Sequence, residues 1–189
     1  MIVGVTGGIG SGKSTVCKVI EVLGFPVFNA DSEAKSIYNN LDFINELKNR
    51  WEHVVVDEKV DLKKISAIVF SKPDELAWLN SKIHPYVDFL FKQWQQKQKN
   101  TILFKEAAIL VESGGYKKCD KIIVVEAPIE ERVKRSIRRD NSNSDAILQR
   151  IKNQISDEDR KVFSDFIITN HEKLIVPQVL KILEALQNS

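Results

Sequence analysis

The sequence predicts a three-layer α/β fold in which a parallel central sheet carries a helical insertion and a helical lid. Three observations support this prediction. Short apolar runs alternate with segments of helical periodicity, which is typical of a parallel sheet. A glycine-rich loop joins the first apolar run to the first helical segment. Helical periodicity then continues from Ser32 to about Gln98 with no clear strand.

The glycine-rich loop lies within residues 4–15 and matches G-x-x-x-x-G-K-[ST] from Gly7 to Ser14. Its glycines permit positive φ values, so the backbone N–H groups can turn toward one phosphate. We expect Lys13 to meet the outer phosphates of a nucleoside triphosphate, and the Ser14 hydroxyl, where the helix begins, to bind Mg²⁺. The residues expected to bind the nucleotide are Gly8, Gly10, Ser11, Gly12, Lys13, Ser14 and Thr15.

Asp31 is the candidate catalytic carboxylate. The loop is followed by a helix that should end at Gly24, and the apolar residues 25–28 then form a second strand that ends at Asn29-Ala30-Asp31. Polar residues at the end of such a strand face the ligand crevice of an open α/β sheet. Asp31 would orient or deprotonate an acceptor hydroxyl there. The alternative is that Asp31 caps the helix that follows.

The helical stretch predicts an insertion at about residues 32–100 that reaches over the site and binds the acceptor. It is longer than a usual crossover between parallel strands. Residues 53–56 break its pattern and are not assigned. His84 precedes Pro85, so it is either a turn residue or a ligand or base.

After the insertion the sheet resumes at residues 101–104, and the apolar residues 109–111 extend the pattern to Glu112. Glu112 has three interpretations: it holds Mg²⁺ through water, binds substrate, or lies on the surface. The remaining expected elements are a strand at 121–125, a helix at 129–139, a polar hinge-like stretch at 140–144, a helix with an apolar face at 147–155, a strand at 166–168 and a helix at 176–186.

The region from 131 to 152 is strongly basic, with seven basic and three acidic residues. Phosphoryl transfer needs cations on the oxygens that gain charge, and a lid that carries arginines supplies them while it excludes water. We therefore predict a lid at about residues 129–160. The alternative for any single arginine is a solvated helix face with ordinary ion pairs.

Composition narrows the class of protein. The 189 residues are 43% hydrophobic and 29% charged, as in a soluble globular domain, and the net charge of +2 does not indicate a nucleic-acid partner. No apolar run approaches the roughly 18 residues that cross a bilayer. Two cysteines without metal-ligand spacing predict neither a disulfide nor a zinc site, and Cys17 should pack as an apolar residue. We expect a cytoplasmic protein; the sequence does not indicate its oligomeric state.

The phosphate loop alone does not separate a kinase from a GTPase. The sequence lacks the Asn-Lys-x-Asp motif that recognises guanine and the Asp-x-x-Gly switch motif. A helical insertion and the basic region at 131–152, which we expect to form a hairpin of two helices, instead favour a small-molecule kinase. A nucleotide-gated switch is the rival from another class, and nucleic-acid binding is disfavoured because the basic hairpin lacks aromatic stacking partners.

Together these motifs resemble the dephospho-CoA kinase family. The segments that carry the resemblance are residues 6–16, Ala30-Asp31, Ile68-Val69-Phe70, Ile83-His84-Pro85, Ile109-Leu110-Val111-Glu112, Tyr116-Lys117-Lys118, residues 135–140, Gln154, Ser164-Asp165 and Asn170. The resemblance implies a P-loop kinase fold that transfers the γ-phosphoryl group of ATP, with Mg²⁺, to the ribose 3′-hydroxyl of dephospho-CoA, the last step of coenzyme A synthesis.

The resemblance also implies residue roles. Lys13 and Asp31 are catalytic, and Arg139 and Arg135 neutralise the transition state. His84 and Glu112 lie where the acceptor binds. The alternative function is that of another nucleotide or small-molecule kinase. Three departures from the family pattern are Asn29 in place of an aspartate, Ala108 in place of a proline and Lys35 in place of an arginine.

Overall fold

The computed structural model describes residues 1–140 and 143–188, which form two compact units. The first unit comprises Met1–Asn29 and Gln98–Ser189, and the second comprises Ala30–Lys97. The hinge-like stretch expected at 140–144 includes residues 141 and 142, which lie outside the described residues.

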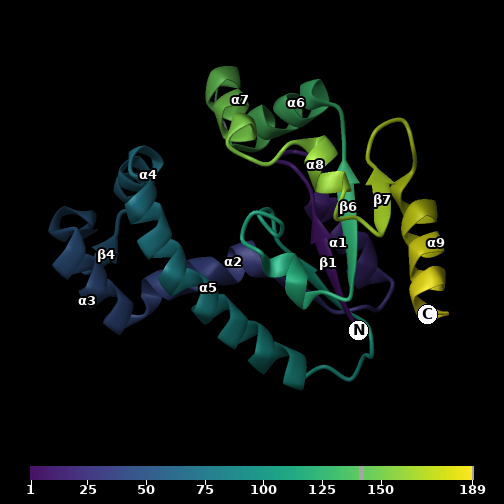
Figure 1. Cartoon of the computed structure of the whole chain (residues 1–189), viewed down its shortest axis with the longest axis horizontal. Coiled ribbons are helices and arrows are strands. Elements are labelled where there is room, and N and C mark those ends of the chain that lie inside the picture. Colours follow the sequence, from purple (N-terminus) through teal and green to yellow (C-terminus); the bar gives the residue numbers. More distant parts are fainter. Residues whose placement is uncertain (141–142, 189) are drawn as a thin grey trace. The chain divides into compact units, whose positions relative to one another are not determined.

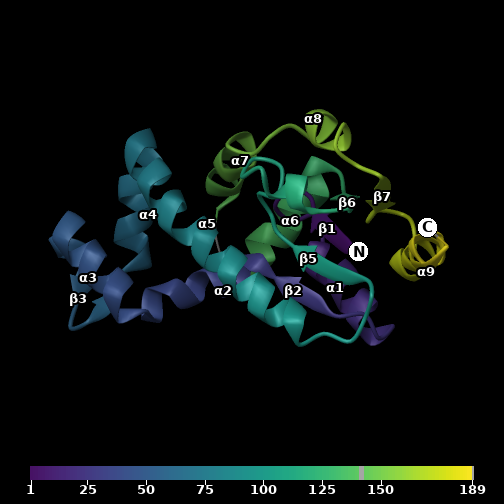
Figure 2. The same cartoon turned by 60° about the horizontal axis from the view of Figure 1, so that its bottom comes forward.

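A parallel five-stranded sheet forms the centre of the first unit (Figure 1), in the order β2-β5-β1-β6-β7, and all five strands are labelled in Figure 2. The strands are β1 (Ile2–Thr6), β2 (Val27–Asn29), β5 (Leu103–Glu106), β6 (Lys121–Glu126) and β7 (Phe166–Thr169). Glu106, the last residue of β5, pairs with Asn29 on one side and with Val5 on the other. The carboxyl ends of β2, β5 and β1 therefore meet at one edge of the sheet, as the sequence predicts for a nucleotide site.

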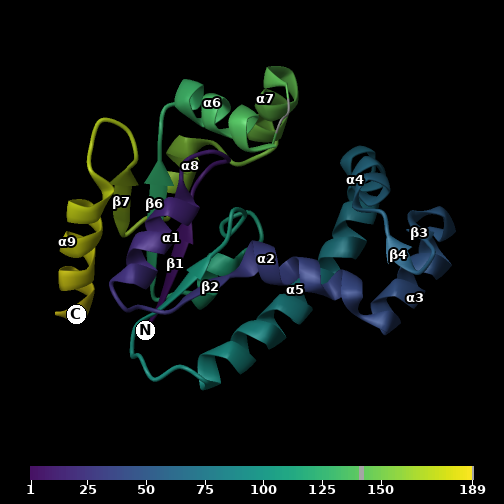
Figure 3. The ribbon, with the colours of Figure 1, turned by 180° about the vertical axis from the view of Figure 1, so that it is seen from behind.

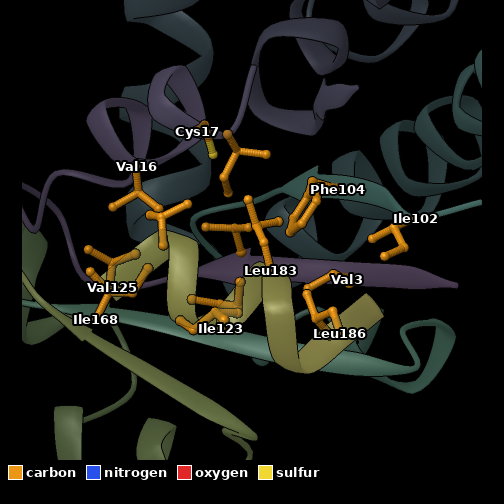
Figure 4. Close-up of a cluster of buried hydrophobic side chains, with 14 residues drawn as sticks. Val3, Val16, Cys17, Ile102, Phe104, Ile123, Val125, Ile168, Leu183 and Leu186 are labelled. Atoms are coloured by element: carbon orange, nitrogen blue, oxygen red, sulfur yellow. The ribbon is translucent and has the colours of Figure 1, made fainter. Parts of the chain in front are cut away.

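One face of this sheet is covered by α1 (Lys13–Val22) and α9 (Ile175–Gln187) (Figure 3). Figure 4 shows the core between them, where Leu183 and Leu186 of α9 lie over the sheet and Cys17 of α1 points into the same cluster. Cys17 is only 4% exposed, which confirms that it packs as an apolar residue. Gly24, at φ 89°, follows the end of α1, as its sequence position predicts.

The other face is covered by the segment that follows β5 and by α8 (Asp157–Lys161), which packs on β6. The apolar residues Ile109-Leu110-Val111 predict that the strand pattern continues to Glu112, and this prediction is wrong. These residues form a turn in which Ser113 N–H donates to the Ile109 carbonyl at 2.9 Å. Leu110 is buried because the turn packs beside Gly4 of the sheet, so its apolar character reflects burial of a loop.

The basic region forms α6 (Ile129–Asp140) and α7 (Ser144–Lys152). Asn143 caps α7 by accepting a hydrogen bond from Ala146 N–H at 2.8 Å. In the first unit a short 3₁₀ turn, η3 (Gly115–Lys118), precedes β6, and Tyr116 in this turn packs edge-on against Phe163.

The second unit is mostly helical (Figure 2). Its elements are α2 (Ala30–Ala34), η1 (Lys35–Asn39), α3 (Leu41–Arg50), η2 (Glu52–Val54), β3 (Val55–Val56), β4 (Lys59–Val60), α4 (Leu62–Ser71) and α5 (Pro73–Gln96). The unassigned residues 53–56 thus enter a two-stranded antiparallel hairpin, whose turn residues Asp57 and Glu58 both have positive φ. Neither turn residue is glycine or asparagine, so the usual hairpin signal is absent from the sequence.

His84 lies inside α5, because the helix continues through Pro85. The interpretation of His84 as a turn residue is therefore wrong. None of the helices within 1–140 and 143–188 combines the length and the apolar character that crossing a membrane requires.

Candidate nucleotide-binding site

The phosphate loop has the backbone geometry that its glycines predict. Gly10 and Gly12 have φ values of 76° and 96°, and Gly12 is the N-cap of α1. Since glycine has no side chain to accept from the first N–H groups of the helix, this end of α1 keeps the arrangement that binds anions. The ammonium group of Lys13 folds back over the loop and donates to the Gly7 carbonyl at 2.9 Å.

A buried carboxylate, Glu106, adjoins the loop at the carboxyl end of β5. It is 4% exposed, and its Oε2 accepts a hydrogen bond from the side-chain amide of Asn29 at 2.7 Å. Its Oε1 accepts from the Ser14 hydroxyl at 3.2 Å. Burial, and then the charge of Glu106, raise the pKa of the Cys17 thiol well above its ordinary value. Sequence reasoning missed Glu106, although an acidic residue that ends an apolar strand is a usable signal.

Ser14 and Glu106 together suit a magnesium ion. A hydroxyl and one carboxylate are hard oxygen donors, and Mg²⁺ usually completes its six ligands with water and substrate phosphate oxygens. Among the residues that the structure describes, no cluster of three or more His, Cys, Asp and Glu side chains could hold a metal ion by itself. A metal at this place would therefore need the nucleotide as a further source of ligands.

Two side chains of the predicted lid, at about residues 129–160, hold the backbone of Ile9 in the loop. Ile9 N–H donates to Gln154 Oε1 at 2.8 Å, and the Ile9 carbonyl accepts from Arg132 Nε at 2.8 Å. The Arg132 side chain is 3% exposed, and burial lowers its pKa although the Asp157 carboxylate acts in the opposite direction. Sequence reasoning missed both residues as contacts of the loop.

Asp157 lies between two buried arginines. It accepts from Arg132 Nη1 at 2.6 Å and from Arg160 Nη1 at 2.8 Å. Arg160, 1% exposed, also pairs with Glu112 Oε1 at 3.4 Å, and the same Glu112 oxygen accepts from Ile155 N–H at 3.3 Å. Glu112 thus lies in an ion-pair network beside the loop.

The two predicted lid arginines have different surroundings. Arg135 donates to the Asn170 carbonyl at 2.9 Å and to the Ser11 carbonyl at 3.5 Å, so it lies at the phosphate loop. Arg139 is 61% exposed and forms two bonds to its neighbour Asp140, at 2.7 and 3.0 Å. The Arg139 guanidinium, together with Arg150, lowers the pKa of Asp140 to about 2.

Asp31 and His84 belong to the second unit. Asp31 is the second residue of α2, which begins at Ala30, so Asp31 is not the residue that caps this helix. It follows Asn29, the last residue of β2, by two positions. The exposed Asp31 carboxylate and the α5 residue His84 are the two sequence-predicted site residues of this unit.

Comparison with known proteins adds three similar chains. A family model described as Dephospho-CoA kinase matches residues 1–175. A Dephospho-CoA kinase of Bacteroides fragilis is 39% identical over 185 residues, which cover 96% of this chain and 90% of that protein. A crystal structure from Thermus thermophilus superposes with a TM-score of 0.91 at 31% identity, covering 98% of this chain and 96% of the other. The Dephospho-CoA kinase from Campylobacter jejuni gives a TM-score of 0.71 at 27% identity, covering 99% and 97%.

Proposed function

The chain belongs to the dephospho-CoA kinase family, and from this premise we propose how its residues divide the work of the reaction. The protein is a kinase that transfers the γ-phosphoryl group of ATP to the ribose 3′-hydroxyl of dephospho-CoA, which gives coenzyme A and ADP in the last step of coenzyme A synthesis. The observation that carries the proposal is the phosphate loop, with its Lys13 ammonium folded over the loop carbonyls.

The donor half of the site lies in the first unit. The loop backbone and the N-terminal end of α1 bind the β-phosphate, and Lys13 leaves the Gly7 carbonyl to contact the β- and γ-phosphates. Ser14 and Glu106, which contact each other, would hold Mg²⁺. When bound, the ion neutralises charge on the phosphate oxygens.

The acceptor half uses residues of the second unit. Asp31 accepts the proton of the 3′-hydroxyl or orients that hydroxyl for attack, and His84 contributes to acceptor binding. Glu112, in the first unit, is a further residue proposed to bind the acceptor. Its two contacts use Oε1, so Oε2 is the atom with which it would bind the acceptor. The insertion at about residues 32–100 is proposed to bind the acceptor.

The lid at about residues 129–160 supplies positive charge to the transition state. Arg135 is already at the loop, whereas Arg139 must exchange Asp140 for a phosphate oxygen. We assign this charge to the phosphates of ATP rather than to a nucleic acid. We also place the enzyme in the cytoplasm, where free thiols such as those of Cys17 and Cys119 persist.

A substrate comparison tests the proposal. ADP formation from ATP and Mg²⁺ is measured with dephospho-CoA, adenosine, shikimate or a nucleoside monophosphate as acceptor. We expect the highest kcat/KM with dephospho-CoA. A higher value with any other acceptor would contradict the assignment of the substrate.

A further inference from the structure

The tip of the phosphate loop is held from both sides of its peptide backbone. Ile9 lies between Gly8 and Gly10, and its N–H and its carbonyl each have a side-chain partner. We propose that Gln154 and Arg132 are positioning residues that hold Ile9, and with it the loop, in the conformation that accepts the phosphates of ATP. This inference rests on the proposed role of the loop in nucleotide binding.

A glycine-rich loop needs such restraint. Glycine gains more conformational freedom in a flexible chain than any other residue, so a loop with four glycines loses much entropy when it closes on a phosphate. A loop that is held in the bound conformation before the ligand arrives avoids part of that loss. The two hydrogen bonds to Ile9 are both 2.8 Å long, well within the range of strong contacts.

The glycines also allow Arg132 to reach the loop. A Cβ atom at Gly8 would overlap the Arg132 guanidinium, and one at Gly10 would overlap the Arg132 carbonyl and the Ser136 hydroxyl. The absence of side chains at Gly8 and Gly10 therefore serves the close approach of α6 as well as the approach of phosphate. A side chain at Gly8 would displace the donor to the Ile9 carbonyl.

The two positioning side chains are themselves anchored. Arg132 is fixed by Asp157, which also binds the buried Arg160. Arg160 donates to the Ile155 carbonyl at 3.0 Å, and Ile155 N–H donates to Glu112, so the residue that follows Gln154 is tied to the segment after β5. The ion-pair network thus fixes the backbone that presents Gln154 to the loop.

The two anchoring residues flank the part of the lid that contains α7 and most of α6. Arg132 is in the first turn of α6, and Gln154 lies just beyond α7. Since both bind Ile9, the base of the lid is fixed to the loop, and Arg139 lies in the part between the two anchors. The lid is therefore tied to the loop at Ile9 from both of these positions.

The test removes the hydrogen-bond acceptor from the side chain of residue 154 and keeps a side chain of similar length. Gln154→Met removes the oxygen that Ile9 N–H binds, Gln154→Glu keeps an oxygen, and Gln149→Met makes the first change at an exposed position on α7. Hydrogen exchange of the Ile9 amide is followed by NMR, and ADP binding by calorimetry without acceptor. Thermal unfolding and the KM for dephospho-CoA are measured on the same proteins.

We expect Gln154→Met to speed exchange at Ile9 and to raise the Kd for ADP by about five- to tenfold, the effect of one lost hydrogen bond. Gln154→Glu should keep the slow exchange, and Gln149→Met should match the wild type. The KM for dephospho-CoA should not change in any of them. Unchanged exchange in Gln154→Met, or faster exchange with unchanged ADP affinity, would overturn the inference. A wild-type protein that does not bind ADP would overturn the proposed function instead.

Discussion

Asp157→Asn should destabilise the protein strongly, because Asp157 is the shared partner of two buried arginines. Its two oxygens accept from Arg132 and Arg160, whose side chains are 3% and 1% exposed. Asparagine offers one oxygen in place of two, so one of the two Nη1 groups loses its acceptor; Arg132 also loses the Asp157 charge, and Arg160 keeps only that of Glu112. Removing one partner of a buried pair costs about 3–5 kcal/mol. Asp157 is 30% exposed, so water partly replaces the lost contacts, and we expect the free energy of unfolding to fall by about 3 kcal/mol.

Urea unfolding at pH 7 measures this loss, with Glu158→Gln as the matched control. Glu158 is the next residue on α8 and is exposed, so the same loss of charge there should change the free energy of unfolding by less than about 0.5 kcal/mol. For a chain of this size, 3 kcal/mol corresponds to a decrease of about 6–12 °C in Tm. Equal unfolding free energies for the two variants would refute the argument that Asp157 stabilises the arginine pair.

Three further predictions concern the site. Asp31→Asn should lower kcat about a hundredfold or more while the Kd for ATP, measured by calorimetry, stays unchanged; unchanged kcat would exclude Asp31 as the base. Glu106→Gln should raise the Mg²⁺ concentration for half-maximal activity about 10- to 100-fold, and the Kd for Mn²⁺ in the ADP complex, measured by electron paramagnetic resonance, should rise in parallel. Asp140 has a pKa lowered to about 2 from an ordinary value of 3.8 by Arg139, so its contribution to stability is present above pH 4 and is lost as pH falls toward 2. The difference in Tm between wild type and Asp140→Asn should therefore shrink between pH 5 and pH 2, and a constant difference would contradict the ion pair.

The parts of the fold that the sequence predicts well are those set by local pattern. The phosphate loop is recognisable because its glycines, Lys13 and Ser14 lie within a few residues and must keep that spacing to surround a phosphate. The alternation of apolar runs and helices likewise predicts the parallel sheet, which the structure and its relatives confirm. Gly24 shows the same principle, since the end of a helix depends on one residue that tolerates positive φ.

The contacts that the sequence did not indicate join residues that lie far apart in the chain. Ile9 and its partner Gln154 are 145 positions apart, and Arg132 is 123 positions from Ile9, so no local pattern relates them. At residues 109–111 the apolar pattern wrongly predicts a strand, because a buried turn and a buried strand both need apolar side chains. A residue before a proline usually avoids the helical conformation, but His84 is helical because α5 continues through Pro85.

Asn29 shows how one departure from the family pattern acts on charge. The family resemblance implies an aspartate at this position, and its carboxylate would face Glu106 across the distance that the Asn29 amide now spans, 2.7 Å. Two carboxylates so close, one of them buried, repel each other strongly. The amide donates a hydrogen bond instead, which stabilises the charge of Glu106 and fixes its Oε1 toward Ser14. The amide at position 29 therefore keeps a second carboxylate away from Glu106 beside the phosphate loop, where the proposed magnesium ion would bind, and the proposed role toward the acceptor hydroxyl stays with Asp31.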